Sequence, residues 1–167
     1  MHPRDAVVKV TLSSICTSDL HILHGAVPRA ERGVTLGHEF VGVVEEAGSA
    51  LSALKKGDRV AVNVETYCGE CYFCRHGWVN NCTHPAGGWA LGCRIDGGQA
   101  EYARIPFADT NLVRIPAHVS DEAAPFARDP LSPGYWAPDM GESHAGGTLR
   151  AMVAGPPAHC SCGAPRP

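Results

Sequence analysis

Four cysteines lie close together in the middle of the 167-residue chain, with the spacing C-x2-C-x2-C-x7-C: Cys68, Cys71, Cys74 and Cys82. Thiolates at such spacing can surround one metal ion, and four of them complete a tetrahedral zinc site. A site with four protein ligands has no position left for a substrate, so its role is structural. The alternative to a metal site is that these cysteines are unpaired thiols in a loop.

An iron–sulfur cluster is the other metal centre that this run could hold, because bacterial ferredoxins also use C-x2-C-x2-C. In that pattern the fourth cysteine follows after three residues and is itself followed by proline. Here the last gap is seven residues, and Thr83 follows Cys82. The spacing therefore favours zinc.

A second group of residues with metal-ligand chemistry lies earlier, in C-T-S-D-L-H (residues 16–21) and G-H-E (residues 37–39). Cys16, His38 and Glu39 together could hold a catalytic zinc that keeps one position open. Taken singly, each has an ordinary interpretation: a small buried hydrophobe, a hydrogen-bonded core histidine and a solvated charge. At this level both interpretations stay open.

The composition is that of a globular protein, with 44% hydrophobic and 19% charged residues and a net charge of −3. The absence of Lys/Arg runs argues against a nucleic-acid surface. No apolar stretch approaches the ~20 residues that span a bilayer, and the N-terminus lacks the apolar core of a signal peptide. Without a secretory signal, eight cysteines predict metal ligands and free thiols in the cytoplasm rather than a disulfide framework.

Short β-branched segments between glycine-rich turns predict a mainly β fold with few short helices. We expect strands at residues 6–12, 40–48, 57–64, 97–106 and 111–116. Their length and spacing indicate a compact β-barrel-like domain. After it, S-D-E-A-A-P-F-A predicts the start of a helix capped by Ser120.

The rest of the chain is rich in proline, since eight of the thirteen prolines lie after residue 116. Pro130, Pro133 and Pro138 are expected to interrupt a helix, at about 3 kcal/mol for each interior proline. We therefore divide the chain into three parts. These are a zinc-binding β-barrel-like domain at 1–116, a linker with the start of helices at 117–149, and an irregular tail at 150–167.

Taken together, C-T-S-D-L-H, G-H-E, G-D-R-V and the four-cysteine run resemble, in order and spacing, the zinc-dependent alcohol dehydrogenases of the medium-chain dehydrogenase/reductase family. The resemblance covers residues 6–149. Within the family, the sequence most resembles members that act on secondary alcohols. It implies a GroES-like, partly open β-barrel with a structural-zinc loop. It also implies a catalytic zinc and a homo-oligomer that oxidises a small alcohol with NAD(P), with no nucleic-acid or membrane partner.

The resemblance implies metal ligands residue by residue. Cys16 and His38 fall on ligands of the catalytic zinc, and Glu39 falls on an acid that joins or leaves the metal. Asp129, in R-D-P-L-S-P-G-Y-W, aligns with an Asp ligand of the same zinc. The cysteines of the run fall on the structural zinc site: Cys68, Cys71, Cys74 and Cys82.

Three further residues receive roles from the resemblance. Asp19 falls on a carboxylate that orients a ligating histidine and fixes its tautomer. Ser18 falls on the hydroxyl that takes the proton of the substrate, and His21 falls on the histidine that relays this proton to solvent.

The resemblance also implies a Rossmann domain for NAD(P), which should begin near residue 148 with G-x-G-x-x-G. The sequence there reads T-L-R-A-M-V-A-G-P-P-A-H-C-S-C-G and lacks that motif. We interpret the chain as a catalytic domain separated from its cofactor domain by a shifted reading frame near residue 150, and we expect it to be inactive alone. A non-catalytic zinc-binding barrel that acts by contact with a partner is the alternative function.

Overall fold

The computed structural model describes residues 1–129, 131–142, 150, 152 and 155–163. The chain divides into two compact units, Met1–Pro125 and Phe126–Pro167. The division falls after residue 116, where we expected the first domain to end, because Val119 and Ala124 still pack against the core of the first unit. Within the described residues, no helix has both the length and the apolar character needed to cross a bilayer.

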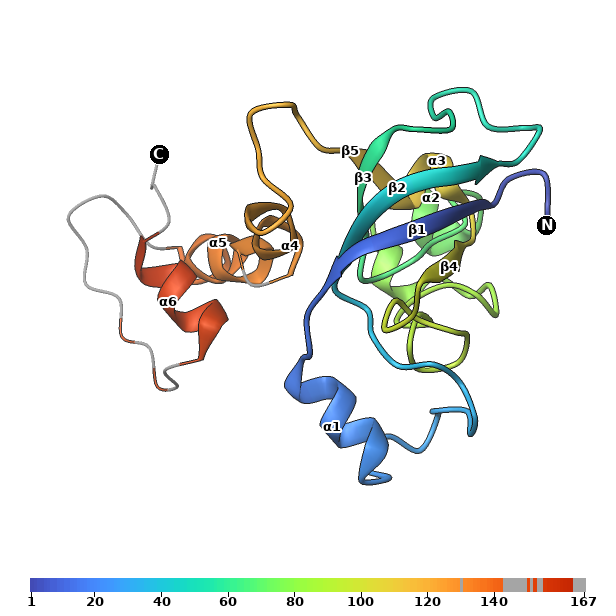
Figure 1. The fold of residues 1–167 in the computed structure, drawn as a ribbon. Coiled ribbons are helices and arrows are strands. Elements are labelled where there is room, and N and C mark those ends of the chain that lie inside the picture. Colours follow the sequence, from blue (N-terminus) through green and yellow to red (C-terminus); the bar gives the residue numbers. More distant parts are fainter. Residues whose placement is uncertain (130, 143–149, 151, 153–154, 164–167) are drawn as a thin grey trace. The chain divides into compact units, whose positions relative to one another are not determined.

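A five-stranded antiparallel sheet, which does not close into a barrel, forms the first unit (Figure 1). Its spatial order is β4-β1-β2-β3-β5. The strands are β1 (Ala6–Ser13), β2 (Phe40–Ala47), β3 (Arg59–Val62), β4 (Tyr102–Ile105) and β5 (Leu112–Arg114). All five predicted strands are confirmed, with ends that differ by a few residues.

Both faces of the central strands are buried, which explains why their sequences are so rich in β-branched residues. Successive side chains of a strand point to opposite faces of the sheet. Phe40 and Val44 of β2 therefore point into the main core, while Val41 points into a smaller cluster with Ala61 and Ile115. Each such side chain stabilises the unit by roughly 1.5–3 kcal/mol relative to its exposure in water.

The helices of the first unit are short, as predicted. They are α1 (Thr17–Leu23), α2 (Tyr72–Arg75), the 3₁₀ helix η1 (Val79–Asn81) and α3 (Ala108–Asn111), while α4 (Ala123–Arg128) spans the division between the two units. The predicted cap is present before α4, where the hydroxyl oxygen of Ser120 accepts the N–H of Ala123 at 3.3 Å.

The second unit contains α5 (Leu131–Met140) and α6 (Pro156–Gly163). The prediction that Pro133 and Pro138 interrupt a helix is wrong, because both lie inside α5; Pro130 lies outside the described residues. Pro133 occupies the first turn, where backbone N–H groups have no acceptor within the helix.

Helix α6 also differs from the expected irregular tail over the residues that the structure describes there. Two prolines open it, and proline is favoured at the start of a helix because its fixed φ suits the first turn. Gly134 of α5 allows α6 to approach closely, since a Cβ atom there would lie 2.5 Å from Cβ of Cys160. The three-part division of the chain itself stays a prediction.

Candidate metal centres

The sulfur atoms of the four-cysteine run come together as predicted. One ligand atom from each of Cys68, Cys71, Cys74 and Cys82 lies within 4.8 Å of the others. Four of the six Sγ–Sγ distances run from 3.4 Å for Cys71–Cys74 to 4.0 Å for Cys71–Cys82. Zinc–sulfur bonds of about 2.3 Å in a tetrahedron place the sulfurs about 3.8 Å apart, whereas a disulfide places them about 2.0 Å apart. The cluster can therefore bind a structural zinc.

The local backbone structure directs the four sulfurs toward a common centre. Cys71 immediately precedes α2, Cys74 lies within it, and Cys82 follows η1. The backbone N–H groups of Glu70 and Cys71 both donate to Sγ of Cys68 at 3.4 Å. Such N–H donors stabilise the negative charge that a thiolate ligand carries.

Asn111, at the end of α3, anchors the base of this loop and is fully buried. Its Oδ1 accepts the N–H of Tyr67 at 3.0 Å, and its Nδ2 donates to the carbonyl oxygen of Pro106 at 2.8 Å. The N–H of Gly88 donates to the carbonyl oxygen of Thr66 at 2.7 Å, which closes the loop. The loop is thus held to the sheet as well as by its sulfurs.

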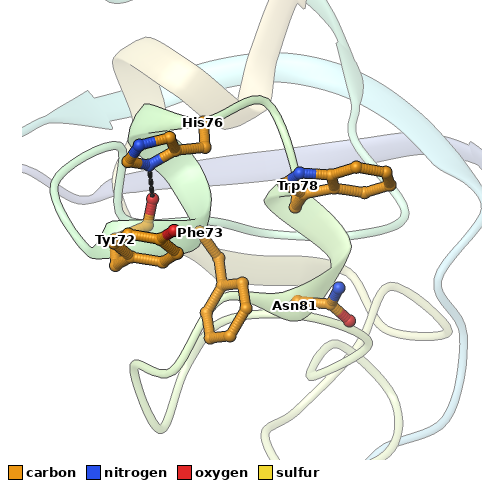
Figure 2. Close-up of a pocket in the computed structure, with 5 residues that line it drawn as sticks. All are labelled: Tyr72, Phe73, His76, Trp78 and Asn81. Atoms are coloured by element: carbon orange, nitrogen blue, oxygen red, sulfur yellow. Dashed lines mark hydrogen bonds between the residues drawn. The ribbon is translucent and has the colours of Figure 1, made fainter.

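An aromatic pocket lies on α2 and η1 of the same loop (Figure 2). It is lined by Tyr72, Phe73, His76, Trp78 and Asn81. The rings of Tyr72 and His76 have centroids 4.2 Å apart, and Nδ1 of His76 lies 2.7 Å from the carbonyl oxygen of Tyr72. Tyr72 and Trp78 are 69% and 61% exposed, so these aromatics belong to the surface of the loop rather than to a core.

Protons and metal compete for the four sulfurs. Backbone N–H groups of Cys74 and Thr83 donate to Cys71 and lower its pKa to about 6. Burial, with a hydrogen bond to Cys71, raises the pKa of Cys74 to about 12. Burial also raises the pKa of Cys82. At neutral pH, Cys71 is ready to bind a metal as a thiolate, while the thiols of Cys74 and Cys82 must first lose a proton.

We therefore predict that zinc binding to the loop weakens steeply from pH 8 to pH 6. Each proton that zinc displaces makes the affinity fall by about tenfold for each pH unit. Zinc titration against a competing chelator at several pH values measures the slope, and proton release in weakly buffered solution counts the displaced protons. An affinity independent of pH would contradict this assignment of protonation states.

The residues predicted to hold a catalytic metal also lie together. Cys16, His38 and Glu39 offer a sulfur, a nitrogen and an oxygen that lie within 4.8 Å of one another. Cys16 immediately precedes α1, and the other two residues lie just before β2. His38 is buried and Cys16 and Glu39 are half-buried. Mixed sulfur, nitrogen and oxygen donors, fewer than four, fit a zinc site that keeps a position open.

Asp19 links the two segments that carry these side chains. Its carboxylate is buried, with only 3% of the side chain exposed. Its Oδ2 accepts the N–H of Cys16 at 3.0 Å, in the manner of a capping box at the start of a helix. Its Oδ1 lies 3.1 Å from Nδ1 of His38. The two atoms are close but do not form a hydrogen bond, and neither has another hydrogen-bond partner among the described residues. A carboxylate that faces Nδ1 leaves Nε2 for a metal, so the role implied for Asp19 stays a prediction that this contact supports.

Glycine is required in the G-H-E segment. Gly37 has φ of +100°, a conformation that residues with a Cβ atom rarely adopt. A Cβ atom at this position would also lie 2.7 Å from both Cγ and the backbone nitrogen of Gln99. The backbone before His38 can therefore pass close to Gln99 only because residue 37 is glycine.

Glu39 is held in place by Ser14. The hydroxyl of Ser14 donates to the carboxylate of Glu39, and the backbone N–H of Ser14 donates to the carbonyl oxygen of Glu39 at 3.0 Å. No motif in the sequence pointed to Ser14, although it lies only two residues before Cys16. This contact limits the positions that the carboxylate can take relative to His38.

Ser18 and His21 lie on α1, beside Cys16. Burial raises the pKa of the Cys16 thiol, and the backbone and hydroxyl groups of Ser18 offset part of that effect by hydrogen bonding to it. Ser18 is half-buried, whereas His21, nearly one helical turn later, is exposed. Asp129 directly follows α4 and belongs to the second unit, and its role as a further ligand stays a prediction.

Comparison with known proteins agrees with the fold and with the motifs. The model of the alcohol dehydrogenase GroES-like domain matches residues 2–117. The chain is 36% identical over 163 residues to an uncharacterised zinc-type alcohol dehydrogenase-like protein, AdhB, of Bacillus subtilis. The match covers 91% of this chain and 43% of that protein.

Two solved structures extend the comparison. The alcohol dehydrogenase TADH from Thermus sp. ATN1 has a TM-score of 0.75 and 41% identity, covering 85% of this chain and 41% of its own. An alcohol dehydrogenase from Escherichia coli CFT073, complexed with NADH, has a TM-score of 0.71 and 36% identity, covering 84% of this chain and 39% of its own.

The chain thus spans less than half the length of each of these relatives. Within that span, the family model, the sheet and the order of the motifs all agree. The chain therefore belongs to the alcohol dehydrogenase GroES-like domain family, among the zinc-dependent alcohol dehydrogenases of the medium-chain dehydrogenase/reductase family.

Proposed function

We propose that this chain is the catalytic-zinc domain of an enzyme that oxidises a small secondary alcohol to a ketone with NAD(P). The observation that carries the proposal is the group of Cys16, His38 and Glu39, whose ligand atoms lie within 4.8 Å of one another. The carboxylate that faces His38 from 3.1 Å supports it further, because ligating histidines are commonly oriented in this way. Asp129 is proposed as a further ligand, with Glu39 as the acid that joins or leaves the metal, so that one position stays open for the substrate.

A zinc ion held by these side chains is a Lewis acid that lowers the pKa of an alcohol oxygen. Asp19 fixes the ring of His38, so that the site keeps one geometry through the reaction. Ser18, beside Cys16, takes the proton of the substrate hydroxyl. His21 is exposed nearly one helical turn later and passes the proton to solvent.

The remaining parts of the proposal concern cofactor, partners and location. NAD(P) accepts the hydride, and the NADH complex of the relative from Escherichia coli supports that choice. The sequence contains no G-x-G-x-x-G, so we assign no residue of this chain to the dinucleotide. The thiolate ligands suit a reducing compartment, which supports the cytoplasm. Homo-oligomer formation rests on the family resemblance alone.

Cobalt substitution tests the proposed function without requiring turnover. We expect that adding a small secondary alcohol to the chain loaded with two cobalt ions changes the visible absorption of one ion. The change is expected at the site of Cys16 and His38, which has an open position, while the four-thiolate site does not respond. A spectrum that stays constant at saturating alcohol would contradict an open, substrate-binding metal site.

Turnover by the chain alone provides a second test. We predict little or no NAD(P)-dependent oxidation by the purified 167-residue chain, because no dinucleotide motif is present in its sequence. A relative of full length, assayed beside it, serves as the positive control. Measurable turnover by the chain alone would refute the prediction that it is inactive in isolation.

A further inference from the structure

Gln99 contacts both parts of the candidate catalytic site, although no motif pointed to it. Its side-chain Nε2 donates to Oδ2 of Asp19 at 2.9 Å. Its backbone N–H donates to the carbonyl oxygen of Leu36 at 2.9 Å, two residues before His38. One residue is therefore bonded both to the carboxylate that faces His38 and to the loop that carries His38.

We propose that Gln99 is a positioning residue for the catalytic metal ligands, an inference that rests on the proposed function. Oδ2 of Asp19 accepts two hydrogen bonds, from Gln99 at 2.9 Å and from the N–H of Cys16 at 3.0 Å. These two donors fix the rotation of the carboxylate. In that rotation the other oxygen, Oδ1, lies 3.1 Å from Nδ1 of His38.

Gln99 is itself an exposed residue, but the carboxylate that its amide contacts is buried. The side chain of Asp19 is only 3% exposed, so water does not substitute freely for a missing donor. Without the amide, Oδ2 keeps only the N–H of Cys16, and the carboxylate can rotate away from His38. The imidazole then loses its fixed orientation, and the metal loses a preorganised ligand.

Contacts with two glycines hold the backbone of Gln99 against the loop that carries His38. The N–H of Gly98 donates to the carbonyl oxygen of Gly37 at 2.8 Å, beside the bond from Gln99 to Leu36. Gln99 also packs so closely against Gly37 that a Cβ atom at residue 37 would lie 2.7 Å from it. The side chain of Gln99 is thus presented to Asp19 by a backbone that is itself fixed.

Cobalt titration of Gln99→Leu tests the proposal. Leucine has a similar volume and no donor, and the backbone bonds of residue 99 remain. We expect the affinity of the Cys16–His38 site to fall by roughly 10- to 100-fold, the usual effect of losing an outer hydrogen-bond partner, and its visible spectrum to change. The four-thiolate site in the same molecule is the internal control and should keep its affinity and spectrum.

Glu101→Leu is the matched control, because it alters an exposed side chain on the same segment and should change neither site. Wild-type affinity and spectrum at the second site of Gln99→Leu would overturn the proposal. An equal loss at both sites would also overturn it, because a positioning role acts on one site alone. A wild-type chain that binds only one cobalt ion would refute the proposed function itself, which separates the two failures.

Discussion

Replacing Cys16 with serine is expected to abolish tight binding of one metal ion while the ion in the four-cysteine loop stays bound. The thiolate is the softest donor of its group, and a serine hydroxyl stays protonated and binds zinc poorly. The nitrogen of His38 and the oxygen of Glu39 are then the only donors of the first unit that remain in the group. We expect a larger fall in affinity than the ~100-fold that follows loss of an outer hydrogen-bond partner.

Equilibrium dialysis against zinc, followed by metal analysis of each variant, measures this effect. Cys160→Ser is the matched control, because it removes a thiol from the second unit that belongs to neither group. It should retain both ions. If Cys16→Ser also retained both ions with wild-type affinity, Cys16 would not be a ligand.

Replacing Cys82 with serine is expected to release the structural zinc and destabilise the first unit by several kcal/mol. Structural zinc contributes about 10–16 kcal/mol of apparent binding free energy in isolated zinc fingers, although part of the loop here is also held by Asn111. Without the metal, no ion holds the three remaining thiols and the serine hydroxyl together. The loop between Thr66 and Gly88 should then open and become accessible to proteases.

Limited proteolysis, metal analysis and urea unfolding together measure this loss. Trp78→Ala is the matched control, because Trp78 lies on the same loop, is 61% exposed and contributes no sulfur. The control should keep its metal and lose little stability. Retention of zinc and of wild-type stability by Cys82→Ser would show that the four sulfurs do not form the ligand set.

The strands and the four-cysteine site could be predicted because their signals are local, whereas the group of Cys16, His38 and Glu39 was predicted from the family resemblance. Residues 40–47 are rich in valine, as is typical of a strand with both faces buried. The four cysteines are so close in sequence that a short loop alone brings their sulfurs together. Pro133 misled the prediction, because a general cost for proline does not distinguish the first turn of a helix from its middle; nothing in the structure explains why α5 also accommodates Pro138 in its interior.

The residues that hold the ligands could not be predicted, because their contacts join distant parts of the chain. Gln99 reaches Asp19 across 80 positions, and Asn111 reaches Tyr67 across 44. Both residues lay in or beside segments that we had assigned to strands, where periodicity describes burial but not the partner of a polar side chain. Only the folded sheet brings these amides to the loops that they support.

The number of metal ions bound by the purified, zinc-saturated chain tests the central claim most directly. We predict two zinc ions per chain: one that resists a moderate chelator, in the four-cysteine loop, and a weaker one held through Cys16 and His38. The contradicting result is a single bound ion that is lost on mutation of Cys82 and unaffected by mutation of Cys16. The chain would then have a structural zinc site and no catalytic one.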